Sequence, residues 1–165
     1  MDETLFSKYK FFGGINMFSN TSRSITKAEL KAIELELGIT FPHSFVEHYL
    51  LYNGGIPSET FFYSEITDIE TEIQIFSPIK YKFNNIDIRT VEEKYELFKK
   101  KSILMSDYLP FANDYGSNQI CISLKDNKVY IVYMDMGELS QECFKYLAND
   151  FDEFINGLSC ESIDD

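Results

Sequence analysis

The sequence predicts a single α+β domain in which helices flank a mainly antiparallel, twisted sheet. Helix signatures stand near both ends of the chain, and segments with the alternating pattern of strands lie between them. A length of 165 residues suits one domain. We expect this domain to span residues 1–165, with a core at about 24–158.

The first helix is predicted within the stretch SITKAELKAIELELG. Thr26 and Glu29 have the spacing of a capping box, and Ile25 and Leu30 have the spacing of a hydrophobic staple. Gly38 can adopt the left-handed conformation that ends many helices. These local signals define both ends of one amphipathic helix.

A second helix is predicted to follow at once, in FPHSFVEHYLLYNGG. Pro42 suits its first turn. Phe45 and Tyr49 lie four residues apart and therefore share one face. Asn53 and the glycines after it tolerate positive φ, so we expect the helix to end there.

The middle of the chain contains one clear strand pattern, from Ile69 to Phe76. Side chains alternate across the two faces of a strand, so this segment should have one apolar face and one polar face. The apolar face contains Ile69, Thr71, Ile73 and Ile75. The polar face contains Asp68, Glu70, Glu72 and Gln74. The segment is predicted to be a half-buried strand with an acidic outer face.

Two further helices are predicted from their caps. Thr90 and Glu93 have the spacing of a capping box, and the basic residues Lys99–Lys101 suit the negative end of that helix dipole. Asp150 and Glu153 have the same spacing at the start of a last helix. The apolar face of that helix would contain Phe151, Phe154, Ile155 and Leu158.

The segment LPFANDYGSNQICISL is predicted to enter a β-hairpin. Leu109–Ala112 would form a short strand, and 113–118 a turn in which Asp114 stays exposed. Residues 120–124 and Val129–Met134 would then pair across the turn at 125–128. Both faces of the second strand are apolar, so we expect it at the centre of the sheet.

Acidic residues dominate the chain, and they are concentrated in two regions. The net charge is −12, from 27 acidic and 15 basic residues. Residues 32–79 contain no lysine or arginine, and residues 129–165 contain only Lys145. Nucleic acid phosphates bind basic surfaces, so we expect no direct nucleic acid partner. Such a charge distribution favours a basic protein partner, or it serves solubility alone.

The sequence contains no recognisable catalytic or cofactor motif. His43 and His48 lie five residues apart and do not share a helix face, which argues against a metal pair. Asn113–Asn118 lacks the alternating carboxylates of an EF-hand loop. Asp126 and Lys128 match an acid-x-lysine fragment of some metal-dependent nucleases, but such matches arise by chance in so acidic a chain. We expect a protein without catalytic residues, metal or cofactor, and keep a metal-dependent hydrolase as the least favoured alternative.

Other features suggest a cytoplasmic location. The cysteines are an odd number at wide spacing, as expected for reduced thiols: Cys121, Cys143 and Cys160. The start MDETLFSKYKFFGG lacks the pattern of a signal peptide. The longest apolar run, Val129–Met134, is too short to cross a bilayer.

Three segments in succession resemble a known signature. The first contains Leu37-Gly38, Phe41-Pro42 and Asn53-Gly54-Gly55. The second contains Leu109-Pro110-Phe111-Ala112 and Gly116-Ser117-Asn118. The third contains Leu147-Ala148-Asn149-Asp150-Phe151 and Glu153-Phe154. Together they resemble the SUKH superfamily, which includes the Smi/Knr cell-wall assembly regulators and many bacterial toxin-immunity proteins.

The resemblance implies an α+β binding module that neutralises a cognate toxin, often a nuclease, and whose partner is therefore a basic protein domain. A regulatory scaffold of the Smi/Knr type, unconnected with toxins, is the alternative. The expected contact residues are acids on the outer strand face and near it: Glu59, Glu65, Asp68, Glu70, Glu72 and Asp114. Aromatic anchors would add affinity if exposed, and the candidates are Phe61, Phe62 and Tyr63.

Overall fold

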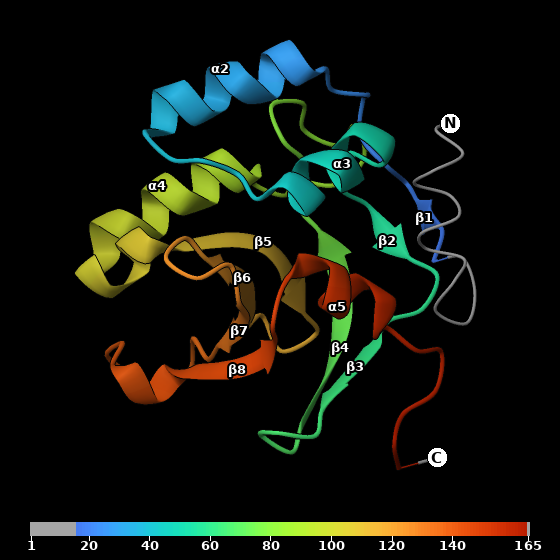
Figure 1. Ribbon diagram of the computed structural model, residues 1–165, viewed down its shortest axis with the longest axis vertical. Coiled ribbons are helices and arrows are strands. Elements are labelled where there is room, and N and C mark those ends of the chain that lie inside the picture. Colours follow the sequence, from blue (N-terminus) through green and yellow to red (C-terminus); the bar gives the residue numbers. More distant parts are fainter. Residues whose placement is uncertain (1–15, 165) are drawn as a thin grey trace.

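The computed structural model describes residues 16–164. A six-stranded antiparallel sheet forms the centre of the molecule (Figure 1). Its strands follow one another in space as they do in sequence. They are β3 (Phe61–Ser64), β4 (Ile69–Phe76), β5 (Tyr108–Asp114), β6 (Gln119–Ser123), β7 (Val129–Val132) and β8 (Phe144–Ala148). The predicted α+β class is confirmed. The stretch Met1–Gly14, where the sequence lacks a signal-peptide pattern, lies outside the described residues.

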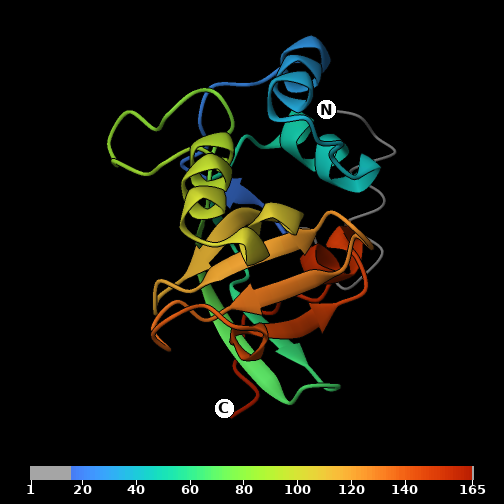
Figure 2. The same cartoon turned by 90° about the vertical axis from the view of Figure 1, so that its left-hand side faces the viewer.

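Four α-helices in the described part of the chain pack around this sheet. They are α2 (Lys27–Leu37), α3 (His43–Leu51), α4 (Val91–Lys101) and α5 (Phe151–Asn156). Short 3₁₀ turns occur at Ile103–Asp107 and Gln141–Cys143, and β1 (Phe18–Ser19) pairs with β2 (Ile56–Pro57). Figures 1 and 2 both place α2, α3 and α4 toward one end of the molecule, and the β3–β4 connection at the opposite end. We call these the helical end (α2, α3 and residues 77–101) and the hairpin end (residues 61–72).

The caps of the helices follow from the sequence, but the capping boxes predicted for α4 and α5 are incomplete, since in α5 the Glu153 carboxylate accepts the N–H of Asn149 and not that of Asp150. In α2 the capping box is complete, because Thr26 and Glu29 each accept the other's backbone N–H at 3.1 Å. In α4 only half of the predicted box forms. Thr90 accepts the N–H of Glu93 at 3.2 Å, but the Glu93 carboxylate lies 3.5 Å from Lys82 instead. A nearby cation competes here with the backbone donor.

Helix α3 anchors the helical end to the sheet. Phe45 and Tyr49 are fully buried, and the Tyr49 hydroxyl donates to the carbonyl of Ser77 at 2.8 Å. The chain then turns at Gly54, where φ is +72° and an added Cβ would fall 2.9 Å from the Phe76 carbonyl oxygen. The N-G-G sequence therefore lets the backbone pass close to β4.

Apolar side chains cover both faces of the sheet. On one face, the Phe111 ring lies 5.3 Å from Phe151 of α5 and 6.2 Å from Phe45 of α3. Strand residues alternate between faces, and the opposite face holds a second, smaller cluster of buried side chains. That cluster comprises Met105, Cys121, Val132, Cys143 and Phe144. The sheet therefore contributes side chains to two hydrophobic clusters, one on each face.

Two expectations about the strands are corrected. The stretch Val129–Met134 forms a strand only as far as Val132, and β7 lies next to the edge strand β8 and not at the centre. Its two apolar faces are explained by the two clusters, because Ile131 belongs to the first and Val132 to the second. Strand β8 itself follows no predicted pattern.

The C-terminal segment covers part of the other sheet edge. Phe61 of β3 donates its N–H to the Ser159 carbonyl at 2.9 Å and accepts the Ser159 N–H at 2.8 Å. Beyond this bridge, Ser162 and Ile163 contact β4. Residues 159–163 therefore lie against β3 and β4, and Figure 1 shows this segment running toward the same end of the molecule as the β3–β4 connection.

Candidate protein-interaction surfaces

The hairpin end brings together four of the acids expected to contact a partner. Glu65 and Asp68 lie in the exposed β3–β4 turn, whereas Glu70 and Glu72 are partly exposed on β4. Asp68 was predicted to lie on the outer face of the strand, but this prediction is wrong. The residue belongs to the turn, where its φ is +55°. The hydroxyl of Tyr63 donates to the Asp68 carboxylate at 2.6 Å and orders this turn.

These carboxylates lack basic neighbours within the described part of the chain. Among residues 16–164, none of the ion pairs involves Glu65, Asp68, Glu70 or Glu72. Their charge is therefore directed at solvent, where it attracts a cationic partner. Glu59 precedes β3 and is outside the hairpin end, and its backbone N–H donates to the Asn16 side chain at 3.2 Å.

Glu70 also has a structural role in the hairpin end. One carboxylate oxygen accepts the Ser162 hydroxyl and the other accepts the Ile163 N–H, both at 2.7 Å. Each oxygen of the Glu70 carboxylate therefore already accepts one hydrogen bond from the C-terminal segment. Glu65, Asp68 and Glu72 form the more open part of this acidic surface.

Asp114 is buried, so the expectation that it stays exposed is wrong. Strand β5 is longer than predicted and includes Asp114, whose exposed fraction is 8%. Its carboxylate accepts the N–H groups of Gly116 and Asn118 at 2.9 Å and the Thr71 hydroxyl at 3.1 Å. Asp114 thus organises the β5–β6 turn, as an Asx motif does. The polar loop that Asp114 begins is a turn, as predicted.

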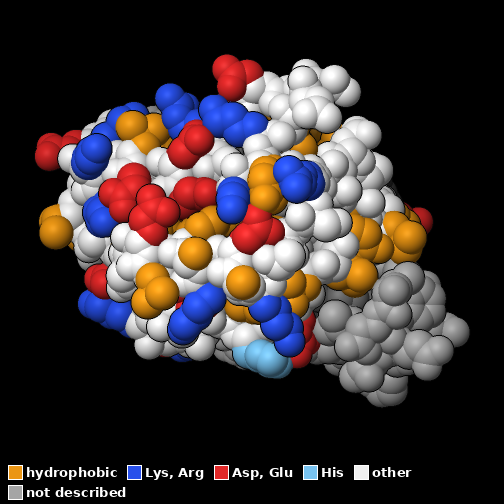
Figure 3. All heavy atoms as spheres, turned by 90° about the horizontal axis from the view of Figure 1, so that it is seen from above, with side chains coloured by type: hydrophobic (Ala, Val, Ile, Leu, Met, Phe, Trp, Pro, Cys, Tyr) orange, Lys and Arg blue, Asp and Glu red, His pale blue; other side chains and the backbone are white. Residues whose placement is uncertain are grey.

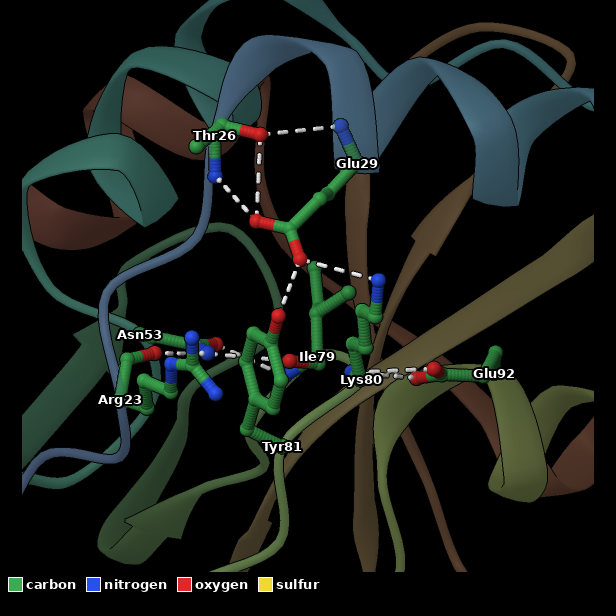
Figure 4. A network of polar contacts seen from close by, with 8 residues as sticks. All are labelled: Arg23, Thr26, Glu29, Asn53, Ile79, Lys80, Tyr81 and Glu92. Carbon is green, nitrogen blue, oxygen red and sulfur yellow. Dashed lines mark hydrogen bonds and ion pairs between the residues drawn. The ribbon is translucent and has the colours of Figure 1, made fainter.

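At the helical end, carboxylates are engaged by cations and hydroxyls. Glu29 accepts the hydroxyl of Tyr81, and the ammonium group of Lys80 lies 2.9 Å away (Figure 4). The hydrogen bond from Tyr81, followed by those from Lys80 and Thr26, lowers the pKa of the Glu29 carboxyl to about 2. The residue predicted only as a helix cap therefore also joins α2 to the segment 80–81.

Asn53 is the buried centre of the same network. Its side-chain N–H₂ donates to the carbonyls of Arg23 and Ile79 at 2.8 and 2.9 Å, and its oxygen accepts the Ile79 N–H at 2.7 Å. Figure 4 shows the three segments converging on this amide. The asparagine of the N-G-G sequence therefore cross-links chain segments that are far apart in sequence.

A groove of about 400 Å³ runs between α2 and α4, with Leu37 and Leu97 among its lining residues. Four glutamates also line it, but so do Arg89 and Lys100. Figure 3 shows acidic and basic side chains intermixed over this end of the molecule. Internal neutralisation makes the groove a weaker candidate for a basic partner than the hairpin end.

Other polar residues considered in the sequence analysis lie in the core or in a turn. Burial lowers the pKa of His48 to about 3, and burial raises the pKa of the Cys121 thiol. Asp126 accepts the Lys128 N–H at 3.1 Å within the β6–β7 turn. Within residues 16–164, no group of three or more His, Cys, Asp or Glu side chains could hold a metal ion.

A pocket that sequence reasoning missed lies between the two edge strands, β3 and β8. Its volume is about 330 Å³, and residues of β3, the β3–β4 turn, β8 and α5 line it. Phe62, proposed as an anchor if exposed, is buried at its floor, while Phe61 and Tyr63 are partly exposed. The pocket depends on β8, for which the sequence offered no signal beyond the short alternation in Phe144–Ala148.

Comparison with known proteins places this architecture in a family. The model of the SMI1 / KNR4 family (SUKH-1) matches residues 24–157. No curated protein matches the sequence. No helix within residues 16–164 is both long enough and apolar enough to span a bilayer. Because the family match covers most of the chain and agrees with the observed fold, the chain belongs to the SMI1 / KNR4 family (SUKH-1).

Proposed function

We propose that this chain is a non-enzymatic binding module that neutralises a basic toxin, such as a nuclease, by covering its functional surface. The observation that carries the proposal is the set of hairpin-end carboxylates without cationic neighbours among residues 16–164. A nuclease is basic where it contacts phosphate, and a protein that presents fixed carboxylates can occupy that surface. Membership of the SUKH-1 family supports a protein-binding role.

The docking surface in this proposal consists of Glu65, Asp68 and Glu72. All three lie on or beside the β3–β4 hairpin, which is held by four residue pairs in antiparallel register. A rigid hairpin loses little conformational freedom on binding, and this favours affinity. Ile66, in the turn between the strands, has an exposed fraction of 78% and adds an apolar contact to the charged surface.

The test begins by capturing the partner from the native host and identifying it by mass spectrometry. The partner is then produced in a sensitive host, alone and together with this chain. Restored growth would support the immunity role. A captured partner that is harmless to cells would favour the alternative, a regulatory scaffold unconnected with toxins. Hydrolysis of nucleic acid by this chain, lost on changing Asp126 or Lys128, would favour an enzyme.

The docking face is tested with charge-reversed variants. Glu65→Lys, Asp68→Lys and Glu72→Lys together should slow association with the partner by at least about tenfold at low salt. The matched control reverses exposed acids elsewhere, Glu36, Glu138 and Glu142, and should slow it much less. If both triple variants associate like the unmodified chain and show the same salt dependence, the hairpin end is not the docking face.

A further inference from the structure

We infer that the pocket between β3 and β8 receives the side chain of an arginine from the basic partner, an inference that rests on the proposed function. The pocket lies beside the proposed docking surface and shares Tyr63, Glu65 and Ile66 with the hairpin end. Its volume of about 330 Å³ is ample for one long side chain, since a water molecule occupies about 30 Å³ in the liquid.

The pocket is preformed by the way the sheet closes. Strands β3 and β8 are the two edges of the sheet and approach each other without a hydrogen-bonded ladder. The hydroxyl of Thr67, in the β3–β4 turn, donates to the Tyr146 carbonyl at 2.9 Å and links this turn to β8. An arginine would therefore enter a space that already exists, at little cost in ordering the receptor.

The floor of the pocket is apolar and tightly held. Phe62 and Leu147 have exposed fractions of only 5% and 2%, and the Phe62 ring lies 4.8 Å from Phe154. Gly157 keeps space for this ring, because an added Cβ would fall 2.7 Å from Phe62 Cε2. Such a floor suits the methylene stem of a long cationic side chain.

The walls are aromatic and their hydroxyls are engaged. Tyr63 donates to Asp68 at 2.6 Å, and Tyr146 donates to the Asn149 side chain at 2.7 Å. Both tyrosines are partly exposed and line the pocket. Aromatic rings attract a guanidinium group, which is flat and weakly hydrated, more readily than they attract a compact ammonium group.

Among the described residues that line the pocket, the only charged ones are two acids, Glu65 and Glu153. Both are exposed, and neither forms an ion pair with another residue in 16–164. One oxygen of Glu153 accepts the Asn149 N–H at 2.7 Å, which fixes the carboxylate at the start of α5. The pocket therefore combines an apolar floor with two tyrosines and two acids, and no basic residue lines it. This lining suits a cation with an apolar stem and repels an anion.

The inference can be tested on the full chain before any partner is known, with arginine amide as the probe. Uniformly ¹⁵N-labelled protein is titrated, and amide chemical shifts are followed. We expect saturable shifts confined to residues 62–66, 146–147 and 153–157. Citrulline amide, a neutral isostere, should cause no such shifts, and lysine amide should bind at least about threefold more weakly. Shifts spread evenly over the acidic surface, or equal shifts with citrulline amide, would overturn the inference.

The matched variants separate this pocket from general acidity. Glu65→Gln with Glu153→Gln removes both charges, while the new amide oxygen at position 153 can still accept the Asn149 N–H. We expect this pair to weaken arginine amide binding at least about tenfold, and the control pair Glu138→Gln with Glu142→Gln to change it less than about twofold. Unchanged binding in the first pair contradicts the inference. If that pair fails to fold, Glu65→Gln alone, in an exposed turn, provides the same comparison.

These outcomes are distinct from those of the proposed function. If the chain neutralises a toxin but does not bind arginine amide, the inference about the pocket is wrong and the proposed function stands. If the chain binds arginine amide saturably but has no toxic partner, the pocket still binds a cation and the proposed function is wrong. Once a partner is identified, one of its arginines should show non-additive loss of affinity with the Glu65→Gln and Glu153→Gln pair in a double-mutant cycle.

Discussion

The helical end and the hairpin end share the acidic stretch 32–79, yet they use its charges differently. Glu34 of α2 is nearly buried and bonds Lys31 and the Phe41 N–H, at 3.4 and 3.3 Å. At the hairpin end, Glu65 and Asp68 face solvent without a cation from residues 16–164. The charge of a sequence segment therefore does not predict the charge of a surface, because the cations that lie near each carboxylate in the folded chain decide how much of that charge is neutralised.

The cations that neutralise the helical end come largely from outside the acidic stretch. Lys80 reaches Glu29, Lys82 reaches Glu93, and Lys99 reaches Glu96 along α4. The fold brings the segment 80–101 beside α2 but keeps it away from the β3–β4 turn, as Figures 1 and 2 show. The helical end is therefore held together by ion pairs, whereas the carboxylates of the β3–β4 turn face solvent.

The largest expected effect is at the helical end. Asn53→Ala removes three hydrogen bonds of a buried side chain and leaves backbone groups of Ile79 and Arg23 without that partner. We expect the free energy of unfolding to fall by roughly 3 kcal/mol or more. Urea denaturation measures this, with the exposed Asn85→Ala as the control, for which a change within about 0.5 kcal/mol is expected. Equal shifts in the two variants would contradict a special role for Asn53.

The second prediction concerns the pH dependence of stability at the helical end, where His48 lies in α3. The pKa of His48 is lowered to about 3 in the folded state by burial, so the unfolded chain takes up a proton first as pH falls. Stability is complete above the unfolded value of about 6.5 and is lost below it, by about 1.4 kcal/mol per pH unit. In His48→Phe this loss should disappear, which would save about 2 kcal/mol at a pH of about 5. Denaturation at about pH 7 and about pH 5 provides the measurement, and parallel pH profiles would refute the assignment.

A smaller effect is expected where the chain end meets β4. Glu70→Ala removes the acceptor for Ser162 and Ile163, whereas Glu72→Ala removes a neighbouring carboxylate without these contacts. We expect amide hydrogen exchange at Ile163 to accelerate about fivefold in the first variant only. Equal acceleration in both would mean that the contact does not restrain the segment.

The smallest effect on stability is expected from the surface proposed to bind. Glu65→Gln with Asp68→Asn removes exposed charges, and asparagine tolerates the positive φ of position 68. The free energy of unfolding should change by less than about 0.5 kcal/mol. A large loss of stability would show that these carboxylates hold the hairpin, and would end the contrast between the two ends.

Sequence reasoning predicted those features that depend on neighbouring residues. Thr26, Glu29 and Gly38 define α2 through contacts within a few residues, and alternation defined β4 to its observed bounds. It missed features that depend on closure of the sheet. Strand β8 is short and has Lys145 on the same face as Leu147, so its pattern is weak.

The same distinction applies to the candidate site. Glu65 and Asp68 were predicted as contact acids on or near the polar face of a strand, and the structure places both in the exposed β3–β4 turn. The burial of Asp114 was not predicted, since it depends on the Thr71 hydroxyl of a neighbouring strand. Glu153 was predicted only as a helix cap, and its place in a pocket with Glu65 requires β3 and β8 to meet.

The bridge between Phe61 and Ser159 has a consequence for self-association. An uncovered sheet edge can recruit a strand from a second copy and begin aggregation. Here the chain's own C-terminal segment occupies the Phe61 position of the β3 edge, and Glu70 holds the residues that follow. The chain thereby protects part of a vulnerable edge from copies of itself, while the β3–β4 turn beside it stays exposed.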